Sequence, residues 1–191
     1  IDKIAGSPVI DAVNIEGGFS PGPAARCGLS DGRVVFVKAA GPELNPISPK
    51  MHRREGQILT RLEAGVPAPN LIGVFDDGDW VALVIEWIDG TMPTAPLSRA
   101  DVDRLLELVG RLATIAGGDA LRPCVDTHPG LFGHWHKLID RPVDNLDAWS
   151  SHHLEELAGL EADVADAIDG DRIVHLDLRS DNVIFATAGR A

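Results

Sequence analysis

The sequence predicts an α+β fold, in which a five-stranded antiparallel sheet carrying one helix is followed by a mainly helical region. Short apolar runs separated by turns rich in Gly and Asp occupy residues 1–88. The composition changes at Asp89, and amphipathic helical patterns follow it. Strands gathered at one end of a chain and helices at the other are typical of this fold class. We therefore predict two lobes, residues 1–88 and residues 89–191.

Two hairpins define the predicted sheet. Asp31 and Gly32 lie between two apolar runs, where an Asp-Gly pair is a strong hairpin signal. A second turn, at residues 76–79, separates two further apolar runs. The five strands that these turns delimit cover residues 9–16, 24–29, 33–39, 71–75 and 80–88.

One helix is predicted between the third and fourth strands. Ser48 is a suitable N-cap residue, and Pro49 suits the first helical position. The helix should end near Gly65, which precedes two prolines. Its apolar face, formed by Ile58, Leu59 and Leu62, would pack on the sheet.

The second lobe begins with a linker over residues 89–96 and continues as helices. Ser98 with Asp101 resembles a capping box, which opens a helix that runs to about residue 117. A short helix is predicted over residues 132–139 and a longer one over residues 151–168. The side chains expected to face inward from the two long helices are Val102, Leu105, Leu106, Val109, Leu112, Leu154, Leu157, Leu160 and Val164.

Composition and charge limit the classes of partner. A formal net charge of −12 argues against nucleic acid, because phosphate binding needs clustered Lys and Arg, and it would suit a cationic substrate. No segment approaches the roughly 20 apolar residues of a membrane span, and the N-terminus lacks a signal-peptide layout. Cys27 and Cys124 have neither disulfide-framework nor metal-ligand spacing. We therefore expect a cytoplasmic protein with reduced thiols.

The segment from Ile173 to Ile184 carries the most specific pattern in the chain. It contains His175-x-Asp177-x-x-x-x-Asn182 between two short apolar runs. Phosphoryl transfer needs a carboxylate that receives the proton of the acceptor hydroxyl, and a second group on the same loop that holds a metal ion. Arg179 would neutralise charge on the transferring group. The alternative is an ordinary polar loop, which four other features of the chain make less attractive.

Two of these features are charged side chains. Lys38 ends an apolar strand, where its ammonium group would face nucleotide phosphates. Glu55, on the following helix, would pair with Lys38 and fix its direction. Alone, the lysine is a common strand-edge residue and the glutamate a common member of a solvated helix face.

The other two features are a glycine-rich loop and a strand end. Gly17, Gly18, Phe19 and Ser20 lie between the first two strands, where glycines allow the backbone to approach phosphates. The segment from Val84 to Gly90 ends the strand lobe, and an extended backbone there can offer a carbonyl and an amide to an adenine edge. Alone, these features indicate only a turn and the last strand of a sheet.

The order of these parts resembles the aminoglycoside phosphotransferase family of the protein-kinase-like fold. The resemblance spans about residues 10–190 and is most specific over residues 175–182. It implies that Asp177 is the catalytic base, that Asn182 is a magnesium ligand, and that Lys38 binds phosphate while paired with Glu55. The backbone of Glu86 and Ile88 would hold adenine.

The function implied is phosphorylation of a hydroxyl on a small molecule, with ATP or GTP as donor and Mg²⁺ as cofactor. An aminoglycoside or a similar antibiotic is one candidate acceptor. The alternatives are a nucleotide-binding pseudokinase with a regulatory role and a protein kinase, which the sequence leaves open.

One departure from the family pattern concerns the end of the chain. The family's second metal-binding aspartate follows the catalytic loop closely, whereas residues 185–191 contain no carboxylate. The chain also begins with Ile1 rather than methionine. We therefore expect a fragment of a longer protein, with an incomplete helical lobe, negligible turnover by itself, and apolar helix faces that promote self-association.

Overall fold

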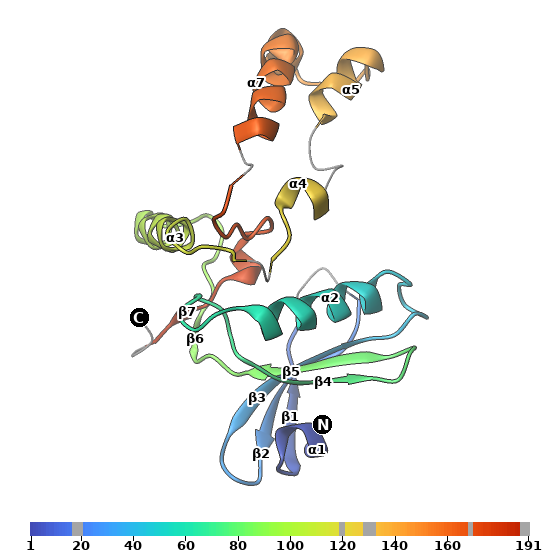
Figure 1. Ribbon diagram of the computed structural model, residues 1–191, viewed down its shortest axis with the longest axis vertical. Helices are drawn as coiled ribbons and strands as arrows, with labels where there is room; N and C mark the ends of the chain where they lie inside the picture. Colours follow the sequence, from blue (N-terminus) through green and yellow to red (C-terminus); the bar gives the residue numbers. More distant parts are fainter. Residues whose placement is uncertain (17–20, 119–120, 128–132, 168–169, 188–191) are drawn as a thin grey trace. The chain divides into compact units, whose positions relative to one another are not determined.

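A computed structural model describes residues 1–16, 21–118, 121–127, 133–167 and 170–187 (Figure 1). Its main feature is one five-stranded antiparallel sheet with the strand order β1-β2-β3-β5-β4. The strands are β1 (Val9–Asn14), β2 (Ala24–Leu29), β3 (Val34–Ala40), β4 (Leu71–Asp76) and β5 (Val81–Glu86). The predicted α+β class and the predicted five-stranded sheet are confirmed.

Helices precede, interrupt and follow this sheet. They are α1 (Asp2–Ala5), α2 (Ser48–Arg61), α3 (Arg99–Leu112), α4 (Cys124–Thr127), α5 (His134–Asp140), α6 (Ala148–His152) and α7 (Leu154–Ala167). A 3₁₀ turn η1 (Ser180–Asn182) and two short paired strands, β6 (Gly90–Thr91) and β7 (Phe185–Ala186), complete the described elements. The sequence patterns did not indicate α1, α4 or β6, which are very short.

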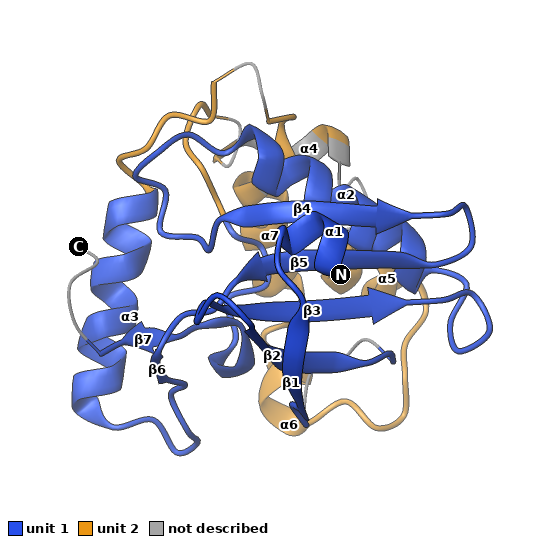
Figure 2. Cartoon of the chain, turned by 90° about the horizontal axis from the view of Figure 1, so that it is seen from below, with its two compact units in different colours: residues 1–112, 175–191 blue, residues 113–174 orange. Residues whose placement is uncertain are grey.

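The chain forms two compact units, which Figure 2 shows in different colours. Unit 1 contains residues 1–112 and 175–191, and unit 2 contains residues 113–174. Unit 1 therefore joins the sheet, α3 and the loop that carries the His-x-Asp motif. These units are defined by contacts, whereas the predicted boundary after residue 88 separates functional lobes and stays a prediction.

The core of unit 1 is organised around β5, which is buried on both of its faces. Val81, Leu83 and Ile85 form one apolar cluster, against which Leu59 of α2 packs. Val84 faces the other way, into a cluster that includes Ala5 of α1. Because side chains alternate along a strand, α2 and α1 cover opposite faces of the sheet (Figure 1).

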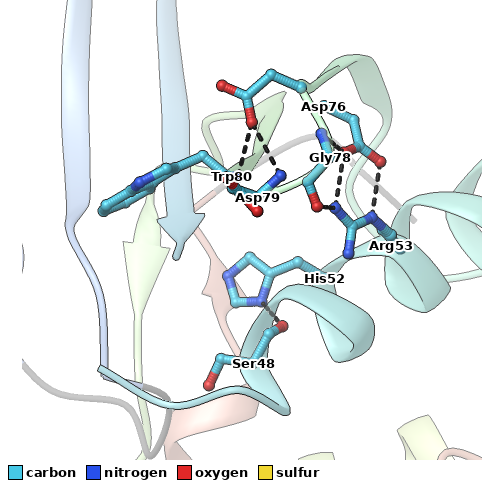
Figure 3. A network of polar contacts seen from close by, with 8 residues as sticks. Ser48, His52, Arg53, Asp76, Gly78, Asp79 and Trp80 are labelled. Carbon is cyan, nitrogen blue, oxygen red and sulfur yellow. Dashed lines mark hydrogen bonds and ion pairs between the residues drawn. The ribbon is translucent and has the colours of Figure 1, made fainter. Parts of the chain in front are cut away.

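The hairpin between β4 and β5 is fastened to α2 by ionic hydrogen bonds (Figure 3). Arg53 donates from Nε and Nη2 to the Asp76 carboxylate at 2.7 and 2.8 Å, and from Nη2 to the Gly78 carbonyl at 2.7 Å. The Arg53 bonds to the carboxylate, followed by the Gly78 amide that donates to Asp76 Oδ1 at 3.0 Å, hold the pKa of Asp76 down at about 2. The bidentate geometry fixes the rotation of α2 relative to the hairpin.

The start of α2 differs from the prediction. Ser48 is the first helical residue instead of the N-cap and is only 2% exposed, and Ile47 occupies the cap position. The side chain of Asn45 accepts a hydrogen bond from the Ile47 amide at 2.8 Å, which supplies the local turn that Ser48 was expected to make. The helix ends at Arg61, earlier than predicted, because Leu62 is extended.

The predicted capping box at the start of α3 is confirmed. The Ser98 hydroxyl accepts from the Asp101 amide at 3.1 Å, and the Asp101 carboxylate accepts from the Ser98 amide at 3.1 Å. Leu112 of this helix is buried, as expected. Leu106 and Val109 are instead 63% and 46% exposed.

In unit 2, a carboxylate on α7 caps the start of α5. Glu161 accepts hydrogen bonds from the amides of His134 and Trp135, both at 2.9 Å. Desolvation opposes ionisation of Glu161, yet these N–H groups at the start of α5 hold its pKa below the ordinary value. The carboxylate thus replaces an N-cap that the α5 sequence lacks.

The helix predicted over residues 151–168 is present as α7 (Leu154–Ala167), but it begins three residues later than predicted. Asp147 caps a separate short helix, α6, by accepting from the Ser150 amide at 2.9 Å. This helix closes at His153, and α7 begins at the next residue. Leu160 and Val164, expected to face inward, are 56% and 40% exposed.

Within the described ranges, no helix combines the length and apolar character that a membrane span requires.

We predict that Leu83→Ala lowers the free energy of unfolding by about 2–5 kcal/mol, because Leu83 is fully buried between β3, β4 and α2. Leu44→Ala is the matched control. Leu44 is 62% exposed, and its truncation should change stability by less than about 0.5 kcal/mol. Urea unfolding followed by circular dichroism would measure both values, and equal effects would contradict the assigned core.

Candidate active site

The sheet presents Lys38 on the face that α2 covers. Lys38 is paired with Leu83 across the β3–β5 register, and directly opposed residues in antiparallel strands point to the same face. Leu83 belongs to the cluster on the α2 side. The lysine therefore emerges from the sheet beside the helix that carries Glu55.

The structure brings Lys38 and Glu55 together in an ion pair. The Lys38 Nζ lies 2.6 Å from the Glu55 Oε2, with 27% and 37% of the two side chains exposed. A pair with this exposure contributes little to stability, but it fixes the direction of the ammonium group. The anchoring of α2 by Arg53 at the neighbouring hairpin sets the position from which Glu55 reaches β3.

The two predicted adenine contacts, Glu86 and Ile88, differ in whether their backbone amides already donate a hydrogen bond. The Glu86 amide donates to the Asn70 carbonyl at 2.9 Å, and the Glu86 carboxylate accepts from the Asn70 side chain at 2.8 Å. These bonds extend the β4–β5 pairing and occupy the Glu86 amide. Among the described residues, no hydrogen bond involves the Ile88 amide. Ile88 is therefore the better candidate for a donor to a base.

The side chain of Trp87, between these two residues, is held from two directions. Its Nε1 donates to the Asp89 carboxylate at 2.7 Å. The guanidinium of Arg26, on β2, lies 5.6 Å from the indole centroid. This cation–π contact connects β2 with the segment that leaves the sheet.

Short backbone pairing links that segment to the loop with the His-x-Asp motif. Gly90 pairs with Ala186 and Thr91 with Phe185. The Thr187 amide and hydroxyl both donate to the Asp89 carbonyl at 3.0 Å. The strand that follows the motif is thus joined directly to the predicted hinge.

Two residues that sequence reasoning missed hold this junction. A Cβ on Gly90 would lie 2.5 Å from the Phe185 carbonyl oxygen, so only glycine fits there without displacement. Arg104 of α3 places its guanidinium 3.8 Å from the Phe185 ring centroid. Neither residue has a local sequence signal, because each acts on a segment about 80 to 95 residues away.

Asp177 and Asn182 meet on the loop itself. The Asn182 side-chain nitrogen donates to the Asp177 carbonyl at 2.9 Å and to the Asp177 Oδ2 at 3.0 Å. This contact directs the amide nitrogen of Asn182 toward Asp177. The amide oxygen, which a hard cation prefers, is at the other end of the group.

Arg179 lies between two carboxylates of the same loop. Its Nε is 3.5 Å from the Asp177 Oδ1, and it donates from Nε and Nη2 to Asp181 at 3.1 and 2.9 Å. Asp181 was not among the predicted site residues, although its spacing of two from Arg179 permits this contact. The predicted role of Arg179 toward phosphate stays a prediction.

The backbone immediately before Asp177 is strained. Leu176 has φ of 63°, in the left-handed region that residues with a Cβ rarely adopt. Such conformations persist where the surrounding structure imposes them, and they occur often at functional sites. Here the left-handed residue directly precedes the candidate base, Asp177.

The predicted glycine-rich loop lies outside the part of the chain that the structure describes. It comprises Gly17, Gly18, Phe19 and Ser20. Across the residues with assigned structure, no cluster of three or more His, Cys, Asp or Glu side chains has the arrangement of a metal site. The side chain of Asn182 carries one neutral amide oxygen, a donor type that Mg²⁺ accepts when phosphate and water oxygens complete its coordination. Its role as a magnesium ligand stays a prediction.

We predict that Gly90→Ala lowers both the melting temperature and phosphotransfer turnover, because the new Cβ would collide with the β7 backbone. Gly110→Ala is the control. Gly110 is inside α3 with no atom within 4 Å of an added methyl group, so alanine should leave turnover unchanged and stabilise the helix by about 0.5–1 kcal/mol. If Gly90→Ala retained both properties, the β6–β7 junction would not be required.

Two solved structures are similar to this chain, and the first of them supports the fold assignment. A candidate fructosamine-3-kinase from Thermobifida fusca YX-ER1 matches with a TM-score of 0.53 and 19% identity, covering 90% of this chain and 62% of that protein. A candidate fructosamine-3-kinase from Haemophilus somnus 129PT matches with a TM-score of 0.44 and 16% identity, covering 62% and 39%. The chain thus spans less than two thirds of either protein. The fold is protein-kinase-like.

Sequence comparison gives a family but no close curated relative. None of the curated proteins matches the chain significantly. Residues 15–191 match the phosphotransferase enzyme family, and this stretch contains strands β2 to β5, the Lys38–Glu55 pair and the loop from His175 to Asn182. Since the match covers well over half of the sequence, the chain belongs to the phosphotransferase enzyme family.

Proposed function

We propose that the protein transfers the γ-phosphoryl group of ATP to a hydroxyl group of a small molecule. The observation that carries this proposal is the contact between Asp177 and Asn182, 3.0 Å from side chain to side chain. It combines a candidate base and a candidate metal ligand on one short loop. The Lys38–Glu55 pair supports the same function, because an oriented ammonium group is suited to nucleotide phosphates.

Each residue has a distinct task in this proposal. Asp177 accepts the proton of the acceptor hydroxyl as its oxygen attacks phosphorus, and Lys38 holds the phosphates of the donor. The Ile88 amide donates a hydrogen bond to the base of the nucleotide. Because that base could be adenine or guanine, GTP is tested alongside ATP. Asn182 contributes one oxygen ligand to Mg²⁺, which neutralises phosphate charge when bound.

The acceptor is proposed to be a cationic, hydroxyl-bearing molecule. The formal net charge of −12 favours attraction of a cation over an anion. Aminoglycosides fit this description, as does the fructosamine after which the two solved structures are named. At 16% and 19% identity, those structures support the fold and leave the acceptor to experiment. A cytoplasmic location accompanies the proposal as a prediction.

The test is a phosphorylation screen of the complete protein with magnesium and either ATP or GTP. Acceptors should include an aminoglycoside, a fructosamine, a choline-like alcohol and a neutral sugar as the uncharged comparison. Transfer of radioactive phosphate to a cationic acceptor would support the proposal. Nucleotide binding without transfer to any acceptor or to water would favour the pseudokinase alternative.

We predict that Asp177→Asn reduces turnover by about 10²–10⁴-fold, because it removes the candidate general base while retaining size and polarity. The Kd for ATP, measured by calorimetry, should stay within about twofold of the wild-type value. Near-full turnover in this variant would exclude Asp177 as the base. Asp126→Asn, on the short helix α4 of unit 2, is a matched control that should keep wild-type turnover.

We predict that Lys38→Ala raises the Kd for ATP by about tenfold or more, since a charge-assisted contact to phosphate is typically worth about 1.5–3 kcal/mol. Glu55→Gln should have a smaller effect, because the ammonium group remains but loses its orientation. Lys50→Ala is the control, because Lys50 is an exposed lysine on the same helix that carries Glu55. Equal effects of the two lysine substitutions would indicate only a general loss of positive charge.

A further inference from the structure

A buried histidine lies one helical turn before Glu55. His52 is 5% exposed, and residues three apart on a helix are neighbours on its surface. Its Nδ1 lies 3.0 Å from the Ser48 carbonyl oxygen (Figure 3). Because a carbonyl oxygen only accepts, Nδ1 must carry the proton, and in the neutral ring Nε2 then carries the lone pair. The orientation and the tautomer of the ring are thereby fixed.

The surroundings of His52 favour the neutral ring. Burial lowers its pKa below the ordinary value, and the nearby positive charge of Lys38 lowers it further. The carboxylate of Glu55 and the hydrogen bond to Ser48 act in the opposite direction and do not prevail. The imidazole thus responds to both members of the ion pair.

Other charges on the packed elements are accounted for. α2 packs against β3, β4 and β5. The charged side chains of these strands are Lys38 in β3, Asp76 in β4 and Glu86 in β5. Asp76 is bound to Arg53, and Glu86 is bound to Asn70. On α2 itself, Glu55 is the carboxylate available to a protonated His52.

We propose that His52 is a positioning residue for the Lys38–Glu55 pair: its neutral imidazole, fixed to Ser48, leaves Glu55 directed at Lys38. This inference rests on the proposed function. An imidazolium at the same place would attract Glu55 and compete with Lys38 for its carboxylate. The ammonium group would then lose the partner that orients it toward the donor phosphates.

The consequence is that turnover should fall at low pH because His52 becomes protonated, independently of any protonation of Asp177. Because the pKa of His52 is lowered, this fall lies below the ordinary histidine range near pH 6.5. Nucleotide affinity should fall less than turnover, because the imidazolium adds positive charge near bound phosphates while Lys38 loses part of its orientation. The effect therefore appears mainly in kcat, with a smaller rise in KM for ATP.

The first experiment measures magnesium-dependent ATP hydrolysis, with water as acceptor, by the complete protein between pH 4.5 and 8. We expect wild-type kcat to fall on the order of tenfold across the lowered His52 pKa, within the usual range of coupling between sites. His52→Asn cannot ionise and keeps a donor near the Ser48 carbonyl, so its kcat should hold to a lower pH. His153→Asn, at an exposed pair with Glu156 in unit 2, should retain the wild-type profile.

A double-mutant cycle tests whether His52 acts through Glu55. In a Glu55→Gln background, His52→Asn should no longer change the pH profile. An unchanged fall at low pH in His52→Asn, or an equal shift in both backgrounds, would overturn the inference. A wild-type protein that neither binds nor hydrolyses ATP would instead refute the proposed function.

Nuclear magnetic resonance of the wild-type protein keeps the inference testable if the variants do not fold. The imidazole ¹⁵N shifts should report a neutral ring protonated at Nδ1 at pH 7. The Glu55 carboxyl ¹³C shift should change with the midpoint at which His52 titrates. A Glu55 signal that is insensitive to that titration would overturn the positioning role, whatever the activity of the protein.

Discussion

The candidate site depends on a backbone connection between two distant parts of the sequence. β6, directly after the predicted hinge, pairs with β7, directly after the candidate catalytic loop. Two further hydrogen bonds from Thr187 to the Asp89 carbonyl extend this pairing. Without it, nothing local to residues 175–182 would relate Asp177 to the strand that ends at Glu86. The absence of a side chain at Gly90 permits this close approach, because any Cβ would meet the β7 backbone.

On the sheet side, a turn determines where the helix that carries Glu55 lies. Asp76 and Gly78 of the β4–β5 hairpin both accept from Arg53, which fixes the rotation of α2. Glu55 is two residues further along and reaches Lys38 at 2.6 Å. The hydrogen bonds of the turn thus position α2, and the position of α2 sets the direction of the Lys38 ammonium group. In the proposed function, a change in the hairpin would therefore affect nucleotide binding without touching the nucleotide.

Sequence patterns were sufficient for features that arise from local periodicity. The strands and both hairpins follow from short apolar runs and the turn signals between them, and the Ser98–Asp101 capping box follows from spacing alone. Patterns failed where an element is too short to carry a periodic signal, as in α1 and β6, and where a local cap divides a helical stretch, as Asp147 does before α7. Arg104 carried no recognisable motif because its contact with Phe185 is distant in sequence. Asp181 and His52 have local contacts, but their spacing matched no motif, whereas that of Asp177 and Asn182 did.

The choice of an amide at position 182 has a physical reason within this loop. A carboxylate there would repel Asp177, whereas the Asn182 nitrogen donates to both its carbonyl and its Oδ2. This bond restricts the rotation of the Asp177 side chain, which follows the left-handed Leu176 in the chain. The amide oxygen of Asn182 is at the other end of the group, so in the proposed function one side chain would orient the candidate base and offer a neutral ligand to a cation. Arg179, between Asp177 and Asp181, adds positive charge without requiring a third element of the fold.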